Sequence, residues 1–226
     1  MTKVVVQKSV MQANDELAAS LRERWQSNRT TVLNLVSSPG SGKTTLLERT
    51  LGALKNEFSI GVLVGDVQTD NDARRLLGYG CAVLQIVTNG TCHLDAAMVA
   101  KHSRALGDES LDLLIIENVG NLVCPASYDL GEDSKVVLLS VTEGEDKPLK
   151  YPAMFRRADA ALLTKSDLLP YVDSDVTLIR DNLSQIHSGI PLLQVSSKTG
   201  EGLDAWYEWI RQRVEQKKAS SPVGQE

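Results

Sequence analysis

The sequence predicts an α/β fold in which a mostly parallel β-sheet of about seven strands is covered by helices on both faces. The first observation behind this prediction is that short apolar runs alternate with helical patterns along the 226 residues. The second is that a glycine-rich loop follows the first apolar run and leads into a helical pattern. Because parallel strands are buried on both faces, they need continuous apolar runs of this kind. The predicted strands lie near residues 31–36, 59–65, 83–87, 111–117, 135–142, 159–164 and 190–196.

The segment ahead of the first strand, residues 1–30, predicts a helix that packs on the core or on a partner. Asn14 offers an N-cap ahead of Leu17, because asparagine is favoured at that position. The apolar positions of this segment share one helical face: Val10, Leu17, Leu21 and Trp25. We therefore expect an N-terminal helix that lies on the core.

The predicted sheet and its helices make residues 31–215 a single domain. A chain of this length with 42% hydrophobic residues can bury one large core. Residues 216–226 are polar and contain Pro222 and Gly224, so burial cannot offset the entropy lost when they order. We predict a flexible tail over residues 216–226.

Composition excludes several classes of partner. The formal net charge of −5 lacks the basic excess that a nucleic-acid-binding surface needs. No apolar segment approaches the roughly 20 residues that span a bilayer, and residues 1–7 lack the apolar stretch of a signal peptide. Three cysteines are too few for a disulfide framework. We expect a cytoplasmic protein without nucleic-acid or membrane partners.

A Gly-Lys-Thr loop connects the first predicted strand to the helical pattern of Leu46, Leu47 and Leu51. At such a junction, unpaired N–H groups and the helix dipole attract phosphate oxygens, so the expected fold is that of a P-loop NTPase. Lys43 can reach the β and γ phosphates, and the Thr44 hydroxyl can ligate Mg²⁺. The expected nucleotide-binding residues are Gly40, Ser41, Gly42, Lys43, Thr44 and Thr45.

One position of this loop departs from the usual pattern, because Ser37 stands where G-x-x-x-x-G-K-[ST] has its first glycine. The loop must therefore start without the conformational freedom that glycine gives. The alternative interpretation is a flexible Gly/Ser turn. The strand before the loop and the helix after it favour the phosphate-binding interpretation.

The base of the nucleotide is predicted from the other end of the sheet. Thr164-Lys165-Ser166-Asp167 resembles the N-K-x-D element of GTPases, with Thr in place of Asn. The carboxylate of Asp167 can accept hydrogen bonds from guanine N1–H and the 2-amino group, which adenine cannot match. The stem of Lys165 would cover the base. Downstream, Ser197 and Lys198 lie in a segment that resembles the S-A-K element, so we predict GTP rather than ATP.

Two acidic residues complete the predicted hydrolytic centre, since they end strands at the edge where parallel sheets bind ligands. Asp66 ends one strand and Glu117 another, and Glu117-Asn118-Val119-Gly120 reads as D-x-x-G with Glu for Asp. Thr44 and one of these carboxylates can together ligate Mg²⁺, which takes oxygen ligands. The sequence does not distinguish Asp66 from Glu117 as the direct ligand. The expected catalytic residues are Lys43, Asp66 and Glu117.

The segment after Asp66 contains two further carboxylates, Asp70 and Asp72. They could serve as switch residues that orient water. Alternatively, they are helix N-terminal carboxylates that the dipole stabilises. The sequence shows no catalytic Gln or arginine finger, so we expect slow GTP hydrolysis that conformational change or dimerisation governs.

A second kind of site is indicated by Cys92 and His93, which follow the strand predicted over 83–87. Cys124 lies seven residues after Glu117 and completes the group. Two thiolates and an imidazole suit Zn²⁺ or Ni²⁺. The alternative is that each cysteine is a small core residue, which is our interpretation of Cys81.

Six segments together resemble the hydrogenase nickel-incorporation GTPase family (HypB). They are S-S-P-G-S-G-K-T-T, G-D-V-Q-T-D-N-D-A, C-H-L-D-A, E-N-V-G-N-L-V-C-P, T-E-G-E-D-K-P-L-K-Y-P and T-K-S-D-L. The resemblance implies a metallochaperone that uses GTP, Mg²⁺ and Ni²⁺ or Zn²⁺ to help load nickel into [NiFe] hydrogenase. It also implies that Cys92, His93 and Cys124 match the family's metal site at a nucleotide-linked homodimer interface. The implied partners are a hydrogenase maturation protein and the hydrogenase large subunit.

Two features differ from the family pattern. Some members carry an N-terminal cysteine motif or a histidine-rich stretch, whereas residues 1–30 here contain neither Cys nor His. Thr164 replaces the usual Asn. Urease-accessory GTPases are the nearest alternative, but C-H-L-D-A and N-L-V-C-P favour the hydrogenase branch.

The sequence disfavours two other functional classes. A non-catalytic zinc- or nickel-storage protein is disfavoured because the chain has only three His and three Cys. An ATP-dependent kinase or ligase is disfavoured by Asp167. We further expect nucleotide state and metal affinity to be coupled, because Cys124 lies on the segment that leaves the strand of Glu117.

Overall fold

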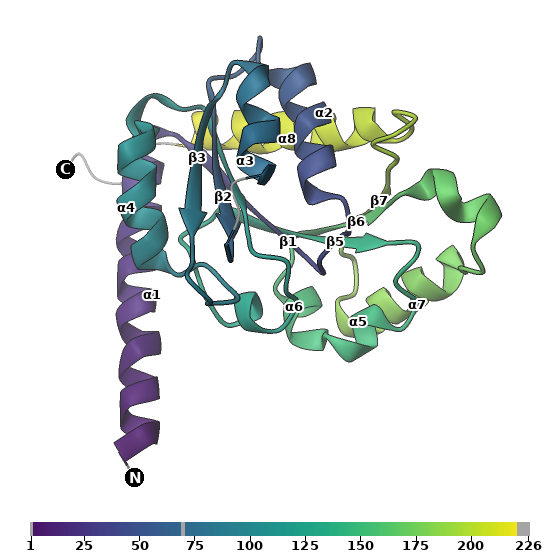
Figure 1. The fold of residues 1–226 in the computed structure, drawn as a ribbon, viewed down its shortest axis with the longest axis horizontal. Helices are drawn as coiled ribbons and strands as arrows, with labels where there is room; N and C mark the ends of the chain where they lie inside the picture. The colour runs from purple at the N-terminus through teal and green to yellow at the C-terminus, as the bar shows by residue number, and fades with distance from the viewer. Residues whose placement is uncertain (1, 69–70, 221–226) are drawn as a thin grey trace.

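The fold is a single seven-stranded sheet in which every neighbouring pair of strands is parallel (Figure 1). The computed structural model describes residues 2–68 and 71–220. Within them the strand order is β3-β2-β4-β1-β5-β6-β7. The strands are β1 (Thr31–Ser37), β2 (Ile60–Asp66), β3 (Ala82–Val87), β4 (Leu113–Glu117), β5 (Ser134–Ser140), β6 (Ala160–Thr164) and β7 (Leu192–Gln194). The predicted α/β class and all seven predicted strands are confirmed.

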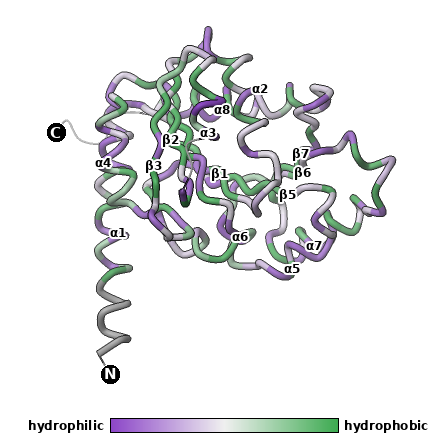
Figure 2. Tube along the Cα trace, in the orientation of Figure 1, coloured by the Kyte–Doolittle hydropathy of each residue, from purple (hydrophilic) through white to green (hydrophobic). Residues whose placement is uncertain are grey.

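Helices cover both faces of the sheet, as predicted. On one face, α2 (Lys43–Leu54) and α8 (Leu203–Ala219) bury Leu47, Leu51 and Trp206 against β1 and its neighbours. On the other, α1 (Thr2–Asn28) and α4 (Ala96–Leu106) pack over β1, β2 and β4, and α6 (Pro152–Arg156) and α7 (Val176–Ile186) over β5 and β6. The apolar strands lie between these layers (Figure 2).

The remaining elements are short and lie at or near the ends of the strands. They are α3 (Asn71–Leu76), α5 (Lys147–Lys150) and the 3₁₀ turns Leu77–Tyr79, Asp108–Ser110, Cys124–Ala126 and Ser166–Tyr171. The loops after β1, β2, β3, β4 and β6 leave the sheet at its carboxyl edge, so the residues predicted for the site gather there.

Helix α1 is longer than its expected cap suggested. It runs from Thr2 to Asn28, so Asn14 lies within the helix and is not its N-cap. The Asn14 side chain instead accepts a hydrogen bond from the backbone N–H of Ala96 at the start of α4. An asparagine can satisfy the free N–H groups of a neighbouring helix as well as those of its own, which explains the wrong prediction.

The predicted packing face of α1 is largely correct. Leu21 and Trp25 are buried, whereas Val10 is 53% exposed. The amino-terminal part of α1 extends past the sheet (Figure 1). The Trp25 indole N–H donates to Asp108, which also binds Arg24. The helix is therefore fixed to the core at its carboxyl end.

The C-terminal segment is helical farther than expected. Helix α8 continues to Ala219 and includes residues 216–219, which we predicted to belong to a tail. The ammonium of Lys217 is buried and lies 2.6 Å from a carboxylate oxygen of Asp133, which holds this last turn on the domain. Residues 221–226 lie outside the described part of the chain.

Among the described helices, none combines the length and apolar character needed to cross a bilayer.

Candidate functional site

The glycine-rich loop lies between the carboxyl end of β1 and the first turn of α2. Gly42 is the N-cap of α2 and has φ of 94°, a left-handed conformation that side chains disfavour. The loop borders a cavity of ≈ 530 Å³ whose lining includes Asp66, Asp72, Glu117 and Lys165. The structure thus brings residues from four predicted motifs to one cavity.

Lys43 points back along the loop and is 8% exposed. Its ammonium donates to the Ser37 hydroxyl at 2.8 Å. Burial lowers the pKa of Lys43, and the nearby Glu117 carboxylate opposes that shift. Ser37 is still part of β1 and has no positive φ, so glycine is not required there. The departure from the usual motif therefore supplies an acceptor for Lys43.

Glu117 ends β4 beneath the loop and is 3% exposed. Its Oε1 accepts a hydrogen bond from the Thr44 hydroxyl at 2.8 Å, whereas Oε2 has no partner among the described residues. Burial raises the pKa of Glu117 to about 7, although the Lys43 charge and the Thr44 hydrogen bond act in the other direction. A buried carboxylate with a free oxygen beside a threonine hydroxyl fits Mg²⁺, which takes oxygen ligands.

The other acidic candidates lie farther out. Asp66 and Asp72 line the cavity, and a carboxylate oxygen of Asp66 accepts from the Gln68 backbone N–H. Asp72 stands in the first turn of α3, so its position fits both a switch residue and a dipole-stabilised carboxylate. Asp70, the other switch candidate, lies outside the described residues.

The two predicted base-recognition elements meet each other and the phosphate loop. The Thr164 hydroxyl donates to the Ser41 carbonyl at 2.7 Å, and the Lys165 ammonium donates to the Gly40 carbonyl at 2.7 Å. Asp167 accepts a hydrogen bond of 2.6 Å from the Ser196 hydroxyl. Thr164, in the place of the usual Asn, therefore ties the base-recognition strand to the phosphate loop.

Sequence reasoning missed three residues that form hydrogen bonds with predicted nucleotide-binding residues. Arg49 donates to the carbonyls of Ser197 and Lys198, which fixes the S-A-K-like loop to α2. Arg75 lines the cavity, pairs with Glu48 at 2.7 Å and donates to the Thr45 hydroxyl. Glu143 accepts from the Ser41 hydroxyl at 2.6 Å. Only Glu143 lies in one of the quoted motifs, and no local spacing marked the two arginines.

We predict that Asp167→Asn shifts base preference from GTP toward xanthosine triphosphate. The 2-oxo group of xanthine accepts a hydrogen bond where guanine donates, and an asparagine amide can supply that donor. Competition titrations of both triphosphates against a fluorescent GTP analogue measure the change. If the wild type binds ATP as tightly as GTP, the base site is misassigned.

We predict that Glu117→Gln stabilises the metal-free protein while it weakens Mg²⁺-dependent hydrolysis. The folded pKa of about 7 lies above the usual 4.5, so ionising Glu117 destabilises the fold as pH rises from 4.5 to 7. The full difference, about 3 kcal/mol, is expected above pH 7. Urea unfolding in chelator at pH 5 and pH 8 measures it. Equal stability of both proteins at pH 8 would contradict this assignment.

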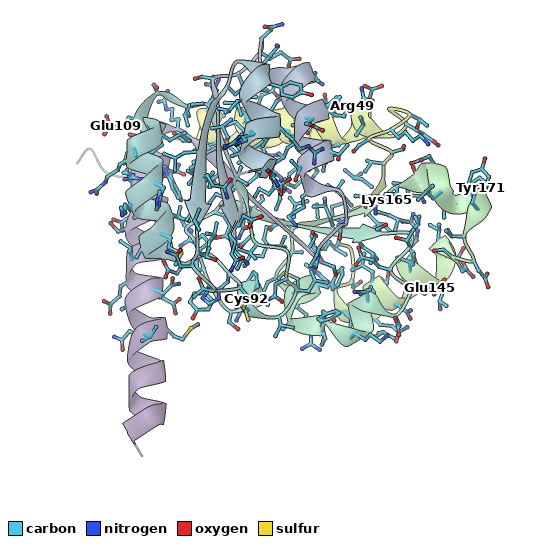
Figure 3. The ribbon with its side chains drawn as sticks, viewed as in Figure 1. Arg49, Cys92, Glu109, Glu145, Lys165 and Tyr171 are labelled. Carbon is cyan, nitrogen blue, oxygen red and sulfur yellow. The ribbon has the colours of Figure 1, made fainter. Side chains whose placement is uncertain are left out.

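The thiolate and imidazole candidates come together beside the cavity. The ligand atoms of Cys92, His93 and Cys124 all lie within 4.8 Å of one another, and the two sulfurs are 2.8 Å apart. Cys92 is labelled in Figure 3, at the carboxyl edge of the sheet. Two of the residues come from the loop after β3 and the third from the loop after β4.

The surroundings of these ligands favour metal binding. The His93 ring stacks on Tyr128 at 3.9 Å, and its Nδ1 is buried without a partner among the described residues. Burial lowers the pKa of His93, which keeps the imidazole in the neutral form that binds metals. The adjacent Cys124 thiol raises the pKa of Cys92, as expected when two thiols share a site without a cation. Three donors leave at least one coordination position open.

The nucleotide cavity and the metal group share β4 and the loop after it. Glu117 is the last residue of β4, and Cys124 begins the 3₁₀ turn seven residues later. The Asn121 amide in between donates to the Cys92 carbonyl at 3.2 Å, so the two loops that carry the candidate metal ligands are in contact. This combination defines a P-loop nucleotide-binding protein with an adjacent candidate site for a transition metal.

Comparison with known proteins agrees with this class. Residues 31–194 match the CobW/HypB/UreG nucleotide-binding domain. Hydrogenase maturation factor HypB of Rhizobium leguminosarum bv. viciae is 50% identical over 207 residues, which cover 92% of this chain and 69% of that protein. Hydrogenase/urease maturation factor HypB of Helicobacter hepaticus is 44% identical over 216 residues, covering 94% and 87%.

A solved structure agrees as well. The crystal structure of HypB from Helicobacter pylori in complex with nickel gives a TM-score of 0.86 at 41% identity, covering 92% of this chain and 98% of that one. The chain therefore belongs to the CobW/HypB/UreG family and, within it, to the HypB hydrogenase maturation factors. The family resemblance inferred from the six sequence segments is confirmed.

Proposed function

We propose that this protein is a GTP-hydrolysing nickel metallochaperone for [NiFe] hydrogenase maturation, in which nucleotide state is coupled to metal binding and dimerisation. The observation that carries the proposal is that one loop, the loop after β4, connects the two sites. It begins after Glu117 in the nucleotide cavity and leads to Cys124, which lies beside Cys92 and His93. The names of the relatives, and the nickel in one of their structures, support it.

In the proposed reaction, water attacks the γ phosphorus of GTP, the bond to the bridging β–γ oxygen breaks, and GDP and phosphate leave. The loop N–H groups and Lys43 hold the phosphates. Thr44 and Glu117 would hold Mg²⁺, which neutralises charge that develops on the phosphate oxygens. Asp70 and Asp72 are the candidates for positioning water, and Asp66 is the second acidic candidate of the hydrolytic centre. Slow turnover is expected, because the sequence shows no catalytic Gln or arginine finger.

Nickel is the proposed cargo of the Cys92, His93 and Cys124 group. Soft sulfur and borderline nitrogen donors prefer Ni²⁺ or Zn²⁺ over Mg²⁺, which separates the cargo site from the nucleotide site chemically. The three donors are one short of a closed tetrahedral site, and a second copy can supply the rest under two-fold symmetry. Val123, beside Cys124, is 62% exposed, as an interface residue of such a dimer would be in one copy alone.

A urease-accessory role is the second candidate, since the Helicobacter hepaticus relative is named for both hydrogenase and urease. Both roles share nickel and GTP and differ in the acceptor protein. The proposed hydrogenase route has a maturation partner and the hydrogenase large subunit as acceptors. A storage role without turnover is less well supported, because metal storage does not require the hydrogen-bonded Thr44–Glu117 pair in the nucleotide cavity.

The proposal predicts that GTP with Mg²⁺ favours a homodimer and that GDP favours the monomer. Sedimentation velocity with a non-hydrolysable GTP analogue or GDP, each with and without Ni²⁺, measures the change. We expect the dimer fraction to rise with the analogue and to rise further with Ni²⁺. A monomer under all four conditions would contradict the dimer-linked part of the proposal.

A further inference from the structure

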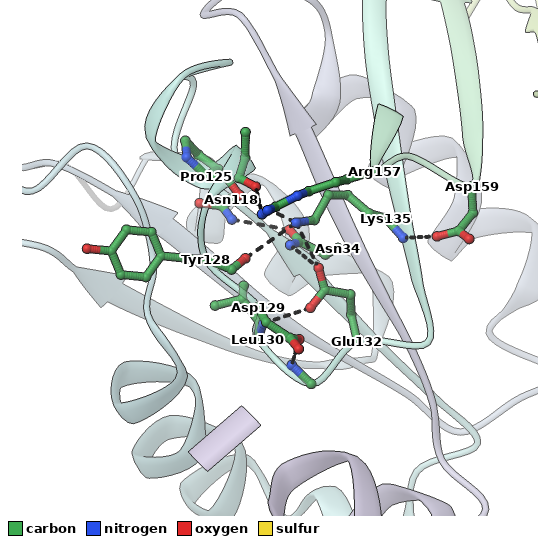
Figure 4. Close-up of polar contacts among 12 residues, drawn as sticks. Asn34, Asn118, Pro125, Tyr128, Asp129, Leu130, Glu132, Lys135, Arg157 and Asp159 are labelled. Atoms are coloured by element: carbon green, nitrogen blue, oxygen red, sulfur yellow. Dashed lines mark hydrogen bonds and ion pairs between the residues drawn. The ribbon is translucent and has the colours of Figure 1, made fainter. Parts of the chain in front are cut away.

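A chain of buried polar side chains joins β1, the segment after β4 and the start of β5 (Figure 4). The Asn118 amide donates to the Asn34 side-chain oxygen at 3.2 Å, and the Asn34 amide donates to a Glu132 carboxylate oxygen at 3.0 Å. The same Glu132 oxygen lies 3.3 Å from the ammonium of Lys135. Asn34 and Asn118 are 0% and 1% exposed, so water cannot replace these hydrogen bonds without rearrangement.

One end of this chain holds the loop that carries Cys92 and His93. The side-chain oxygen of Asn118 accepts from the backbone N–H of Leu94 at 3.2 Å, and Leu94 directly follows His93. Asn118 itself directly follows Glu117, the carboxylate proposed for Mg²⁺. A shift of Glu117 therefore moves the group that holds the His93 loop.

The other end of the chain holds the loop of the third ligand. The Lys135 ammonium donates to the Pro125 carbonyl at 3.4 Å and to the Tyr128 carbonyl at 3.3 Å. Pro125 directly follows Cys124, and the Tyr128 ring stacks on His93. The metal ligands of both loops are thus tied to one polar chain, and Asn118 is its member beside the nucleotide cavity.

We propose that Asn118 is the positioning residue through which the nucleotide state at Glu117 sets the geometry of the Cys92, His93 and Cys124 group. This inference rests on the proposed function, because it assumes that nucleotide and metal are coupled. When Glu117 and the γ phosphate share a cation, the peptide that follows Glu117 is fixed in position. Asn118 then keeps its hydrogen bonds to Leu94 and Asn34. Loss of the γ phosphate frees that peptide and loosens both metal loops.

The protein offers a matched control for the role of Asn118. Asn14 is also a buried asparagine, and it joins nearly the same two segments: it accepts from Ala96 N–H and donates to the Asp129 carbonyl at 2.9 Å. It lies on α1, however, and its side-chain hydrogen bonds go to Asp15, Asp129 and Ala96, not to β4 or the phosphate loop. Asn14→Ala therefore removes support from the metal loops without removing a link to the nucleotide.

The test is Ni²⁺ titration of wild type, Asn118→Ala and Asn14→Ala with a GTP analogue and with GDP, both with Mg²⁺. We expect a wild-type affinity ratio between the two states of about fivefold or more, in the range typical of allosteric coupling. Asn118→Ala should bring the ratio to within about twofold, whereas Asn14→Ala should keep it even if both affinities fall. GTP-analogue affinity without Ni²⁺ should stay within about twofold of wild type in Asn14→Ala, which lies outside the lining of the nucleotide cavity.

The outcomes separate the two proposals. A wild-type ratio near one overturns the coupling itself and, with it, the role of Asn118. A normal wild-type ratio that persists in Asn118→Ala overturns the role of Asn118 alone. If Asn118→Ala does not fold, Asn34→Ala takes its place, since it removes the partner of the Asn118 amide and leaves the bond to Leu94. The ratio should fall in Asn34→Ala too, and an unchanged ratio there contradicts the inference.

Discussion

Lys43→Ala is expected to lower GTP affinity or turnover at least tenfold, a loss of about 1.4 kcal/mol or more. Lys43 is the buried cation at the loop, and its hydrogen bond to Ser37 shows that it is held within the phosphate cradle. Removing it leaves phosphate charge without a compensating cation. Binding of a fluorescent GTP analogue and steady-state phosphate release measure the two parts of the effect.

The matched control for this prediction is Lys101→Ala. Lys101 lies on the exposed side of α4, away from the nucleotide cavity, and carries the same charge. It should bind and hydrolyse GTP like the wild type, so a loss specific to Lys43 is not an effect of net charge. Full GTPase activity in a folded Lys43→Ala protein would remove the nucleotide assignment.

The Cys92→Ala/Cys124→Ala double variant is expected to lose more than about a hundredfold in Ni²⁺ affinity. Even changes to residues that only support metal ligands cost roughly 10–100-fold, and this variant removes two of three direct donors. GTP-analogue binding by the metal-free monomer should stay nearly intact, since neither sulfur lines the nucleotide cavity. Cys81→Ala removes a thiol that packs against the core instead and should bind Ni²⁺ normally.

The same titrations carried out at several pH values give a second check of the ligand set. Protons compete with the metal for thiolate and imidazole, so affinity should fall as pH drops. The raised pKa of the Cys92 thiol and the lowered pKa of His93 make thiolate formation the main cost near neutral pH. Unchanged affinity in the double variant would contradict the site, whatever the pH.

Much of the fold could be predicted because its signals are local. Buried parallel strands require apolar runs, and those runs fix the strands to within two residues of their observed ends. The phosphate loop could also be predicted from the sequence, since a helix that starts at Lys43 after two glycines is a local arrangement. The chemistry of Cys92, His93 and Cys124 also followed from residue type once the strands placed them at one edge of the sheet.

What could not be predicted depends on contacts between distant segments. Asn14 accepts from the first N–H group of α4, whose N-cap is Asp95, and does not cap its own helix, because the choice among free N–H groups is decided by packing. Helix α8 extends through Lys217 because the Lys217 ammonium forms an ion pair with Asp133, which lies on a loop distant in the sequence. The polar chain from Asn118 to Lys135 passes through Asn34, which is 84 residues from Asn118 and 98 from Glu132, and no spacing rule relates Asn34 to either residue.

The central proposal is that nucleotide binding and Ni²⁺ binding are thermodynamically coupled. The measurement is the Ni²⁺ dissociation constant of the wild-type protein with Mg²⁺ and either a GTP analogue or GDP, together with the reciprocal titration of nucleotide with and without Ni²⁺. Linkage requires both experiments to give the same coupling factor, which we expect to be about fivefold or more. Equal Ni²⁺ affinity in the two nucleotide states would contradict a nucleotide-controlled nickel site in this protein.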